Sequence, residues 1–138
     1  MSEFDTARQN MVDGQLRPTK VTDSRLLDVM STLPREMFVD KSRQGIAYID
    51  EDIEVSEGRH LMEPVVLARL VQSLELTEAD SVLVIGSATG YDAACADSLG
   101  ELRDMFIALD ARLPESQRER WHGVAAQLAA GGGGGGGG

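Results

Sequence analysis

The pattern of apolar and polar positions divides the first part of the chain into short helices. Residues 5–16 carry apolar side chains at helical spacing. A second helix follows the cap pair Thr22 and Asp23. Pro34 then begins a further helical turn, because proline at the first helical position lacks only an amide that would be unpaired there anyway. Residues 44–60 show no helical period, so we expect loop and short extended pieces there.

Two apolar segments with different patterns follow. Residues 64–74 form the clearest helix of the chain, because their apolar positions make one continuous stripe at helical spacing. Residues 81–85 are a short run rich in β-branched side chains that stops at Gly86. Such a run is typical of a strand buried on both faces of a sheet.

A turn with two glycines comes directly after this predicted strand. Residues 86–91 read Gly-Ser-Ala-Thr-Gly-Tyr, and residues 91–96 can begin a helix. Strand, glycine turn and helix in this order open many nucleotide-binding units. Small residues let a ligand approach the backbone, and free amides at a helix start favour an anionic group. A tight turn with a purely structural role is the alternative. The candidate cofactor-binding residues of the turn are Gly86, Ser87, Ala88 and Gly90.

The segment after residue 96 has two interpretations. As a strand, residues 105–109 end at Asp110, which lies 24 residues after Gly86, close to the ~20-residue interval at which an acid binds ribose hydroxyls. As a helix, the segment carries a heptad seam from Leu99 to Leu113. We favour the helix, because the seam persists over five apolar positions. Asp110 is then a solvated charge, and the seam is a surface for a protein partner.

Charge and composition exclude several classes of function. The 13 Lys and Arg residues against 23 Asp and Glu give a net charge of −10, which argues against binding nucleic acid or an anionic membrane. Two histidines and the single Cys95 predict no metal site. No apolar run reaches the ~18–20 residues of a membrane span, and the acidic start of the chain is unlike a signal peptide. We therefore expect a cytoplasmic protein.

Several blocks of residues occur in an order known from one enzyme family. They are Arg8-Gln9-Asn10-Met11-Val12, Leu33-Pro34-Arg35-Glu36-Met37-Phe38-Val39, Ala47-Tyr48 and residues 80–94. On these blocks the chain resembles the amino-terminal half of the protein-L-isoaspartate O-methyltransferases. The resemblance implies an α/β fold, the start of a class I (Rossmann-like) methyltransferase domain. We expect that domain to be truncated, because two strands cannot make a mostly parallel sheet covered on both faces.

The resemblance also implies a domain organisation and an activity. Residues 1–75 are the helical segment of the family, residues 76–130 a partial methyltransferase domain with a helical end, and residues 131–138 a polyglycine tail. In the family, the glycine turn holds S-adenosyl-L-methionine and an acid such as Asp110 holds its ribose. The methyl group goes to the carboxylate of an isoaspartyl residue in a protein or peptide, the first step of protein repair.

The segment on the substrate side departs from the family pattern. The family has approximately G-x-T-I-S-Q-P, whereas residues 58–64 read Gly-Arg-His-Leu-Met-Glu-Pro. Met62 replaces the serine credited with an active-site role, and a thioether cannot donate a hydrogen bond. Glu63 replaces the glutamine and sets a carboxylate near the substrate carboxylate; at ~4 Å two like charges cost from about 1 kcal/mol in water to several where partly desolvated.

These departures leave the catalytic residues unassigned. His60 and Glu63 are the remaining candidates, and a lone loop histidine is more often a surface residue. We expect slow or absent methylation of isoaspartyl peptides. The alternative function is a non-catalytic interaction or assembly subunit derived from the same fold, since an incomplete sheet leaves a strand edge open for another chain.

Overall fold

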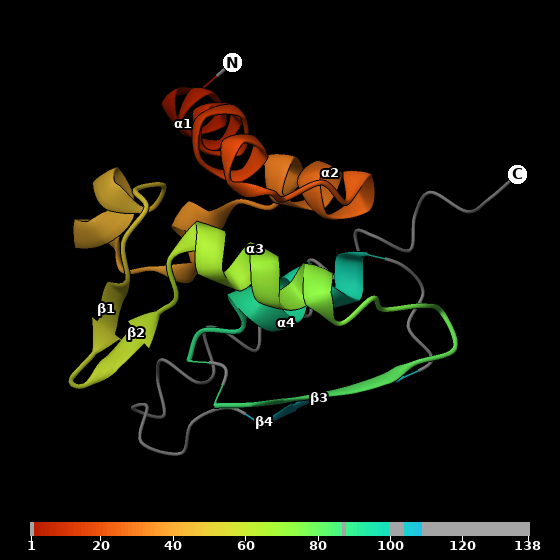
Figure 1. Cartoon of the computed structure of the whole chain (residues 1–138). Coiled ribbons are helices and arrows are strands. Elements are labelled where there is room, and N and C mark those ends of the chain that lie inside the picture. Colours follow the sequence, from red (N-terminus) through yellow and green to blue (C-terminus); the bar gives the residue numbers. More distant parts are fainter. Residues whose placement is uncertain (1, 87, 100–103, 109–138) are drawn as a thin grey trace, which may run out of the picture.

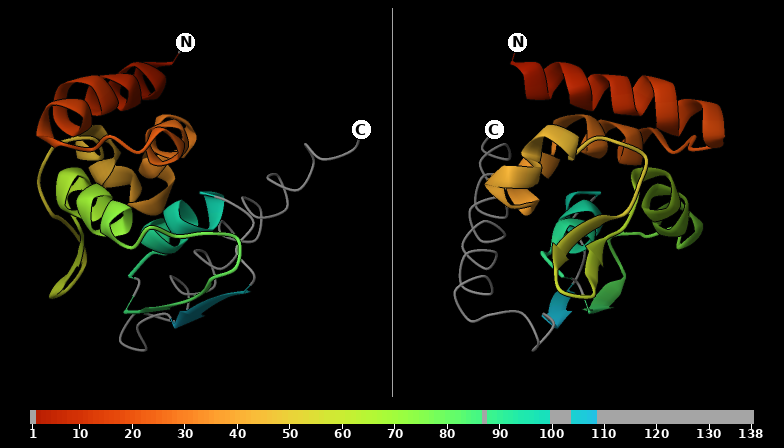
Figure 2. Two further views of the ribbon diagram at one scale, coloured as in Figure 1. Left: turned by 45° about the vertical axis from the view of Figure 1, so that its right-hand side comes forward. Right: turned by 90° about the vertical axis from the view of Figure 1, so that its left-hand side faces the viewer.

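A computed structural model describes residues 2–86, 88–99 and 104–108 of the chain (Figure 1). The helices α1 and α2 form an upper layer, α3 and α4 lie beneath them, and the strands β3 and β4 lie at the bottom (Figures 1 and 2). A small hairpin, β1 and β2, stands at one side. The elements are α1 Glu3–Met11, η1 Val12–Leu16, η2 Arg17–Thr19, α2 Ser24–Thr32, η3 Arg35–Phe38, η4 Lys41–Ile46, β1 Ile53–Ser56, β2 Arg59–Leu61, α3 Pro64–Ser73, β3 Ser81–Ile85, α4 Tyr91–Ser98 and β4 Asp104–Ala108.

The first predicted helix is present with shifted limits. It begins at Glu3 because Ser2 and Asp5 form a reciprocal capping box, in which each side chain accepts a hydrogen bond from the other's amide. Its last turns widen into the π-helical η1. The second helix is confirmed as α2, with the Asp23 carboxylate accepting from the Arg25 amide at 3.0 Å.

Residues 44–60 are partly extended, as predicted. The strands β1 and β2 pair antiparallel, with Ile53 opposite Leu61 and an irregularity between Glu54 and Ser56. The 3-10 helix η4 covers the start of this region, and the hydrophobic pattern did not indicate it. Pro34 precedes η3, so it caps a 3-10 turn and is not its first residue.

The helix over residues 64–74 and the strand over residues 81–85 are both confirmed, as α3 and β3. The prediction that this strand is buried on both faces is wrong. Leu83 is 60% exposed and Ile85 is 80% exposed. Both α3 and α4 lie on the same side of β3 and β4 (Figure 2). Val82 therefore packs against the core, while the opposite face of the strand is open.

The helical interpretation of the segment from Leu99 to Leu113 is wrong for residues 104–108. They form β4, parallel to β3, with Ser81 opposite Asp104. Pairing with a neighbouring strand satisfies a row of backbone groups, and this outweighs local helical spacing. The proposed partner surface on the helical seam loses its basis, and residues 100–103 and 109–113 of the seam lie outside the described residues.

Candidate functional site

The glycine turn (residues 86–90) joins the carboxyl end of β3 to the start of α4. Gly86 has φ +71° and Gly90 has φ +87°, so both occupy the left-handed region that favours glycine. A Cβ added at either position would meet nothing within 4 Å. The turn therefore needs glycine for its backbone conformation, and the space beside both residues is open to a ligand.

Replacing Gly90 with alanine is expected to lower the free energy of unfolding by about 1–2 kcal/mol, the cost of a left-handed backbone for a residue with a Cβ. Gly90→Asn is the matched control and should lose clearly less, because asparagine tolerates this region. Urea denaturation of both variants measures the difference. Equal losses would contradict the conclusion that the left-handed backbone conformation selects glycine here.

Thr89 is a residue of the turn that sequence reasoning missed. Its side chain is almost completely buried, yet its hydroxyl finds no hydrogen-bond partner among the described residues. Buried polar groups are nearly always paired in native proteins. Gly90, which precedes α4, offers no side-chain cap, and in the first turn of the helix the Asp92 carboxylate accepts from the Ala93 amide at 2.8 Å. The unpaired hydroxyl and the open glycines fit a polar ligand at this turn, while Ser87 lies outside the described residues.

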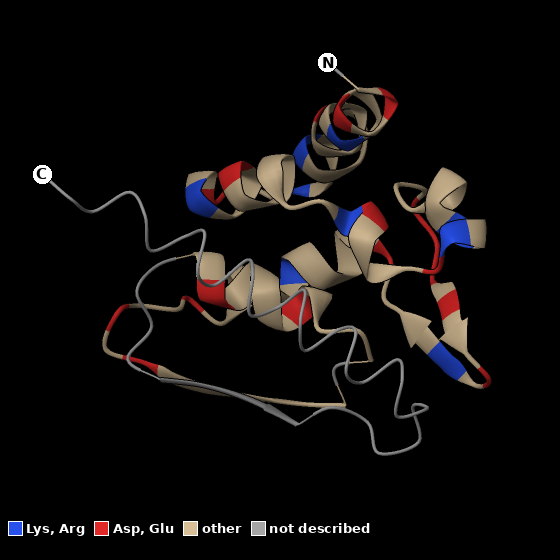
Figure 3. Ribbon diagram, turned by 180° about the vertical axis from the view of Figure 1, so that it is seen from behind, with Lys and Arg blue, Asp and Glu red and all other residues tan. Residues whose placement is uncertain are grey.

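The substrate-side segment (residues 58–64) runs from the hairpin into α3. The Glu63 amide donates to the Asp52 carboxylate at 2.8 Å. The Met62 side chain is 39% exposed, so the core does not require it. Most of the charged residues of the hairpin and of the loop before it are acidic, such as Asp52 and Glu54, and Arg59 adds one positive charge on β2 (Figure 3).

His60 lies on the hairpin opposite Glu54. The His60 Nε2 and Glu54 Oε2 atoms are 4.0 Å apart, and both side chains are about half exposed. An exposed pair of this kind contributes little to stability. This geometry favours the surface interpretation of His60 over a catalytic one.

Arg35 joins the two sides of the candidate site. Its side chain is completely buried. Its Nη2 donates to the Met62 carbonyl at 2.9 Å, and its Nε donates to the Ala47 carbonyl at 2.6 Å. Its guanidinium lies 4.8 Å from the ring centroid of Tyr91, the first residue of α4. One side chain thus contacts both the substrate-side segment and the helix that follows the glycine turn.

The helix α4 is anchored by buried groups that keep their protons. Burial raises the pKa of the Cys95 thiol from its ordinary 9.0 to about 12, and burial also raises the pKa of the Tyr91 hydroxyl above its ordinary 10.0. In the unfolded chain both groups ionise near their ordinary values. The unfolded state therefore releases protons first, and the folded state loses stability as the pH rises above about 9.

We expect unfolding to become easier between pH 9 and pH 12, by up to about 1.4 kcal/mol per pH unit for each group. Below pH 9 these groups should cause no change. Thermal unfolding at a series of pH values measures the slope. The control is Tyr91→Phe, which removes one of the two buried ionisable groups and should make the fall shallower. A slope unchanged by this substitution would contradict the assignment.

A second buried cluster ties the amino-terminal helix to the rest. Arg8 donates to both carboxylate oxygens of Glu36 at 3.1 and 3.2 Å, and to the Tyr48 hydroxyl at 2.8 Å. The Tyr48 hydroxyl in turn donates to Glu36 and accepts from the Arg35 amide. Arg8, Glu36 and Tyr48 make up what we term the Arg8 cluster. These three residues lie in blocks that carry the family resemblance.

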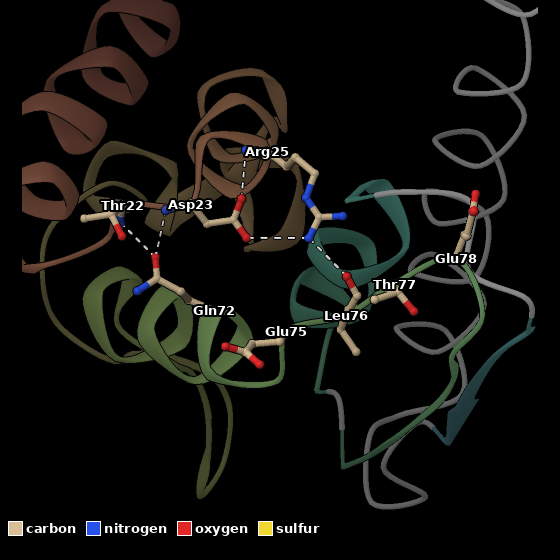
Figure 4. Close-up of a pocket in the computed structure, with 8 residues that line it drawn as sticks. All are labelled: Thr22, Asp23, Arg25, Gln72, Glu75, Leu76, Thr77 and Glu78. Carbon is tan, nitrogen blue, oxygen red and sulfur yellow. Dashed lines mark hydrogen bonds and ion pairs between the residues drawn. The ribbon is translucent and has the colours of Figure 1, made fainter.

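A cavity of about 700 Å³ lies elsewhere, between the start of α2 and the connection from α3 to β3 (Figure 4). Gln72 Oε1 accepts from the amides of Thr22 and Asp23, at 2.8 and 2.9 Å. Arg25 donates to the Leu76 carbonyl at 3.0 Å. The polar groups that edge this cavity are thus used to hold α2 against α3.

Two further findings concern the described residues only. No three of their His, Cys, Asp and Glu side chains come together in a way that could hold a metal ion. None of the helices described here is both long enough and apolar enough to cross a membrane.

The fold and the turn define a class of protein. A parallel strand–helix–strand unit with an open glycine turn at the carboxyl end of its first strand is typical of the start of a nucleotide-binding α/β domain. The family model described as "Protein-L-isoaspartate(D-aspartate) O-methyltransferase (PCMT)" matches residues 6–111. The chain belongs to this family.

Curated relatives agree with this assignment. Proteins named protein-L-isoaspartate O-methyltransferase from Methanoculleus marisnigri and Koribacter versatilis are each 35% identical, over 78% and 72% of this chain and 47% and 45% of their own length. A protein-L-isoaspartate O-methyltransferase 1 from Pelobacter propionicus is 37% identical over 85% of this chain and 53% of its own length. The chain thus spans about half the length of these relatives.

Proposed function

We propose that the chain is an S-adenosyl-L-methionine-dependent methyltransferase whose glycine turn holds the amino-acid end of the cofactor. The observation that carries this is the left-handed, open backbone at Gly86 and Gly90, in a chain of this family. Ala88 is a small residue, and the buried Thr89 hydroxyl has no hydrogen-bond partner among the described residues, which supports a polar ligand beside the turn. When bound, the cofactor supplies a methyl group activated by its sulfonium.

We extend the proposal to the ribose. Asp110 lies outside the described residues, but it follows the last residue of β4, Ala108, by only two positions. Acids just beyond the carboxyl end of the second strand hold ribose hydroxyls in such units. The strand at residues 104–108 therefore supports Asp110 as a cofactor residue, and we propose Ser87 as another because of its place in the glycine turn.

The acceptor we propose is the carboxylate of an isoaspartyl residue in a protein or peptide, as the names of the relatives indicate. Here a carboxylate oxygen takes the methyl group and becomes an ester. Met62 offers no hydrogen bond to orient that oxygen, and Glu63 repels it. We therefore propose a slow enzyme. A cytoplasmic location and a domain boundary near residue 75 remain predictions.

A methylation assay tests this function. The full chain is incubated with S-adenosyl-L-methionine carrying a labelled methyl group and with an isoaspartyl peptide or its aspartyl twin. We expect slow incorporation that depends on the isoaspartyl residue. Equal incorporation into both peptides would contradict the acceptor, and normal rapid turnover would contradict the impairment.

A non-catalytic interaction subunit is the second candidate, and the open face of β3 with Leu83 and Ile85 favours it. An exposed apolar face on a strand invites pairing or packing with another chain. Sedimentation of the purified chain tests this alternative. A well-behaved monomer would count against it.

A further inference from the structure

We propose that Arg35 is the positioning residue that holds the substrate-side segment in register with the glycine turn. This inference rests on the proposed function, because the register matters only if donor and acceptor meet between these two parts. Arg35 is a completely buried cation without a carboxylate among the hydrogen-bond partners that the described structure gives it. Burying a charge in this way costs free energy unless hydrogen bonds and other contacts of the charged group compensate for the lost water. The contacts of Arg35 are therefore the feature to explain.

The first contact fixes one peptide group of the substrate-side segment. Arg35 Nη2 donates to the Met62 carbonyl at 2.9 Å, and the amide on the other side of the same peptide bond, that of Glu63, donates to Asp52 at 2.8 Å. The peptide group is therefore held from both ends. Its plane sets the direction in which Met62 and Glu63 leave the backbone.

The second contact fixes the helix after the glycine turn. The Arg35 guanidinium lies 4.8 Å from the ring centroid of Tyr91. The ring of Phe38 packs edge-on against the same Tyr91 ring, with 5.3 Å between the two ring centroids. A buried cation over an aromatic face is a strong contact. Tyr91 is completely buried and follows Gly90 directly. A contact that fixes its ring therefore also fixes the end of the glycine turn.

The two contacts make Arg35 a link between sites that are separate in the sequence. The Ala47 carbonyl, at 2.6 Å from Arg35 Nε, fixes the guanidinium plane, so the Met62 carbonyl and the Tyr91 ring are held in one arrangement relative to each other. A lysine could replace the charge but could not bind two carbonyls and stack on a ring at once. Small misplacements of reacting groups are costly in catalysis, which gives this link its function.

Hydrogen exchange of single amides tests the link without any methyl acceptor. In Arg35→Lys we expect the Glu63 and Ala94 amides to exchange about tenfold faster, the effect of losing a hydrogen bond to a charged group. The Ala94 amide reports on α4, because it donates to the Gly90 carbonyl at 2.9 Å. The matched control is Arg8→Lys, another buried arginine, which contacts neither Met62 nor Tyr91 in the described structure.

The control should leave both amides unchanged after correction for global stability. Equal acceleration in the two variants would overturn the proposal. If Arg35→Lys does not fold, the link is tested instead by comparing exchange of the Glu63 amide in Tyr91→Phe and in Tyr91→Leu. Phenylalanine keeps the ring face against Arg35, so the Glu63 amide should exchange as slowly as in the wild type. Leucine removes the ring, so the Glu63 amide should exchange faster. Protection of Glu63 in both would contradict the link.

A second arm adds S-adenosylhomocysteine. In the wild type we expect the ligand to slow exchange of the first α4 amides and also of Glu63, and in Arg35→Lys to slow only the α4 amides. Ligand protection of Glu63 in both proteins would overturn the link. Absence of any ligand effect on α4 would instead contradict the proposed cofactor site, and the ligand-free arm would still decide the role of Arg35.

Discussion

Replacing Met62 with serine and Glu63 with glutamine is expected to raise the rate of isoaspartyl-peptide methylation about a hundredfold, within the range of a positioned polar or proton-transferring group. The serine hydroxyl would orient the substrate carboxylate, and the glutamine would remove a repelling charge. Met62 is 39% exposed, so its loss should cost the fold little. Initial rates with a labelled methyl donor measure the change.

Met37 provides the matched control for the expected rise in methylation rate. It is 40% exposed, and Met37→Ser therefore makes the same chemical change at a similar surface position outside the candidate site. We expect its methylation rate to equal that of the wild type. An unchanged rate in the double variant would mean that Met62 and Glu63 do not limit catalysis.

Replacing Arg8 with methionine is expected to lower the free energy of unfolding by about 3–5 kcal/mol, as for other buried ion pairs that lose one partner. The substitution leaves the Glu36 carboxylate, whose side chain is 11% exposed, without its cation. It also takes away the donor at 2.8 Å from the Tyr48 hydroxyl. Urea denaturation measures the loss.

Two comparisons make this result specific to the Arg8 cluster. Arg17 forms an exposed pair with Asp13 at 3.1 Å, so Arg17→Met should cost below about 1 kcal/mol. Adding Glu36→Gln to Arg8→Met should recover part of the loss, because the uncompensated charge disappears. A loss below about 1 kcal/mol for Arg8→Met would contradict a structural role for the cluster.

Local signals in the sequence were sufficient for the elements that end in strong caps or turns. The Asp23 cap and Pro64 each predicted the start of a helix, and Gly86 predicted the end of β3. Proline and glycine restrict or widen the backbone choices of their own position, so their effect does not depend on distant residues.

The strand β4 could not be predicted in this way. Its residues fit a heptad seam, and their true partner is β3, which lies more than twenty residues earlier in the chain. The choice between helix and strand depends on that tertiary pairing, because a short apolar run is compatible with both. The same pairing restores Asp110 as a candidate ribose ligand.

The role of Arg35 was also hidden from the sequence. Arginine is almost never completely buried, so a pattern of residues gives no reason to set it in a core beside Tyr91. Its position among the residues that resemble the family was visible, but its contacts with Ala47 and Met62 join segments 12 and 27 residues away. Only the folded chain brings them together.

The most direct measurement for the glycine turn is a calorimetric titration of S-adenosylhomocysteine into the wild type and into Gly86→Asn. Asparagine tolerates the left-handed backbone at φ +71°, so the fold should survive, but its side chain enters the space that is open beside Gly86. We expect saturable binding to the wild type and at least about tenfold weaker binding to the variant, a difference of about 1.4 kcal/mol. No heat at millimolar ligand, or equal affinity in the two proteins, would contradict a cofactor site at this turn.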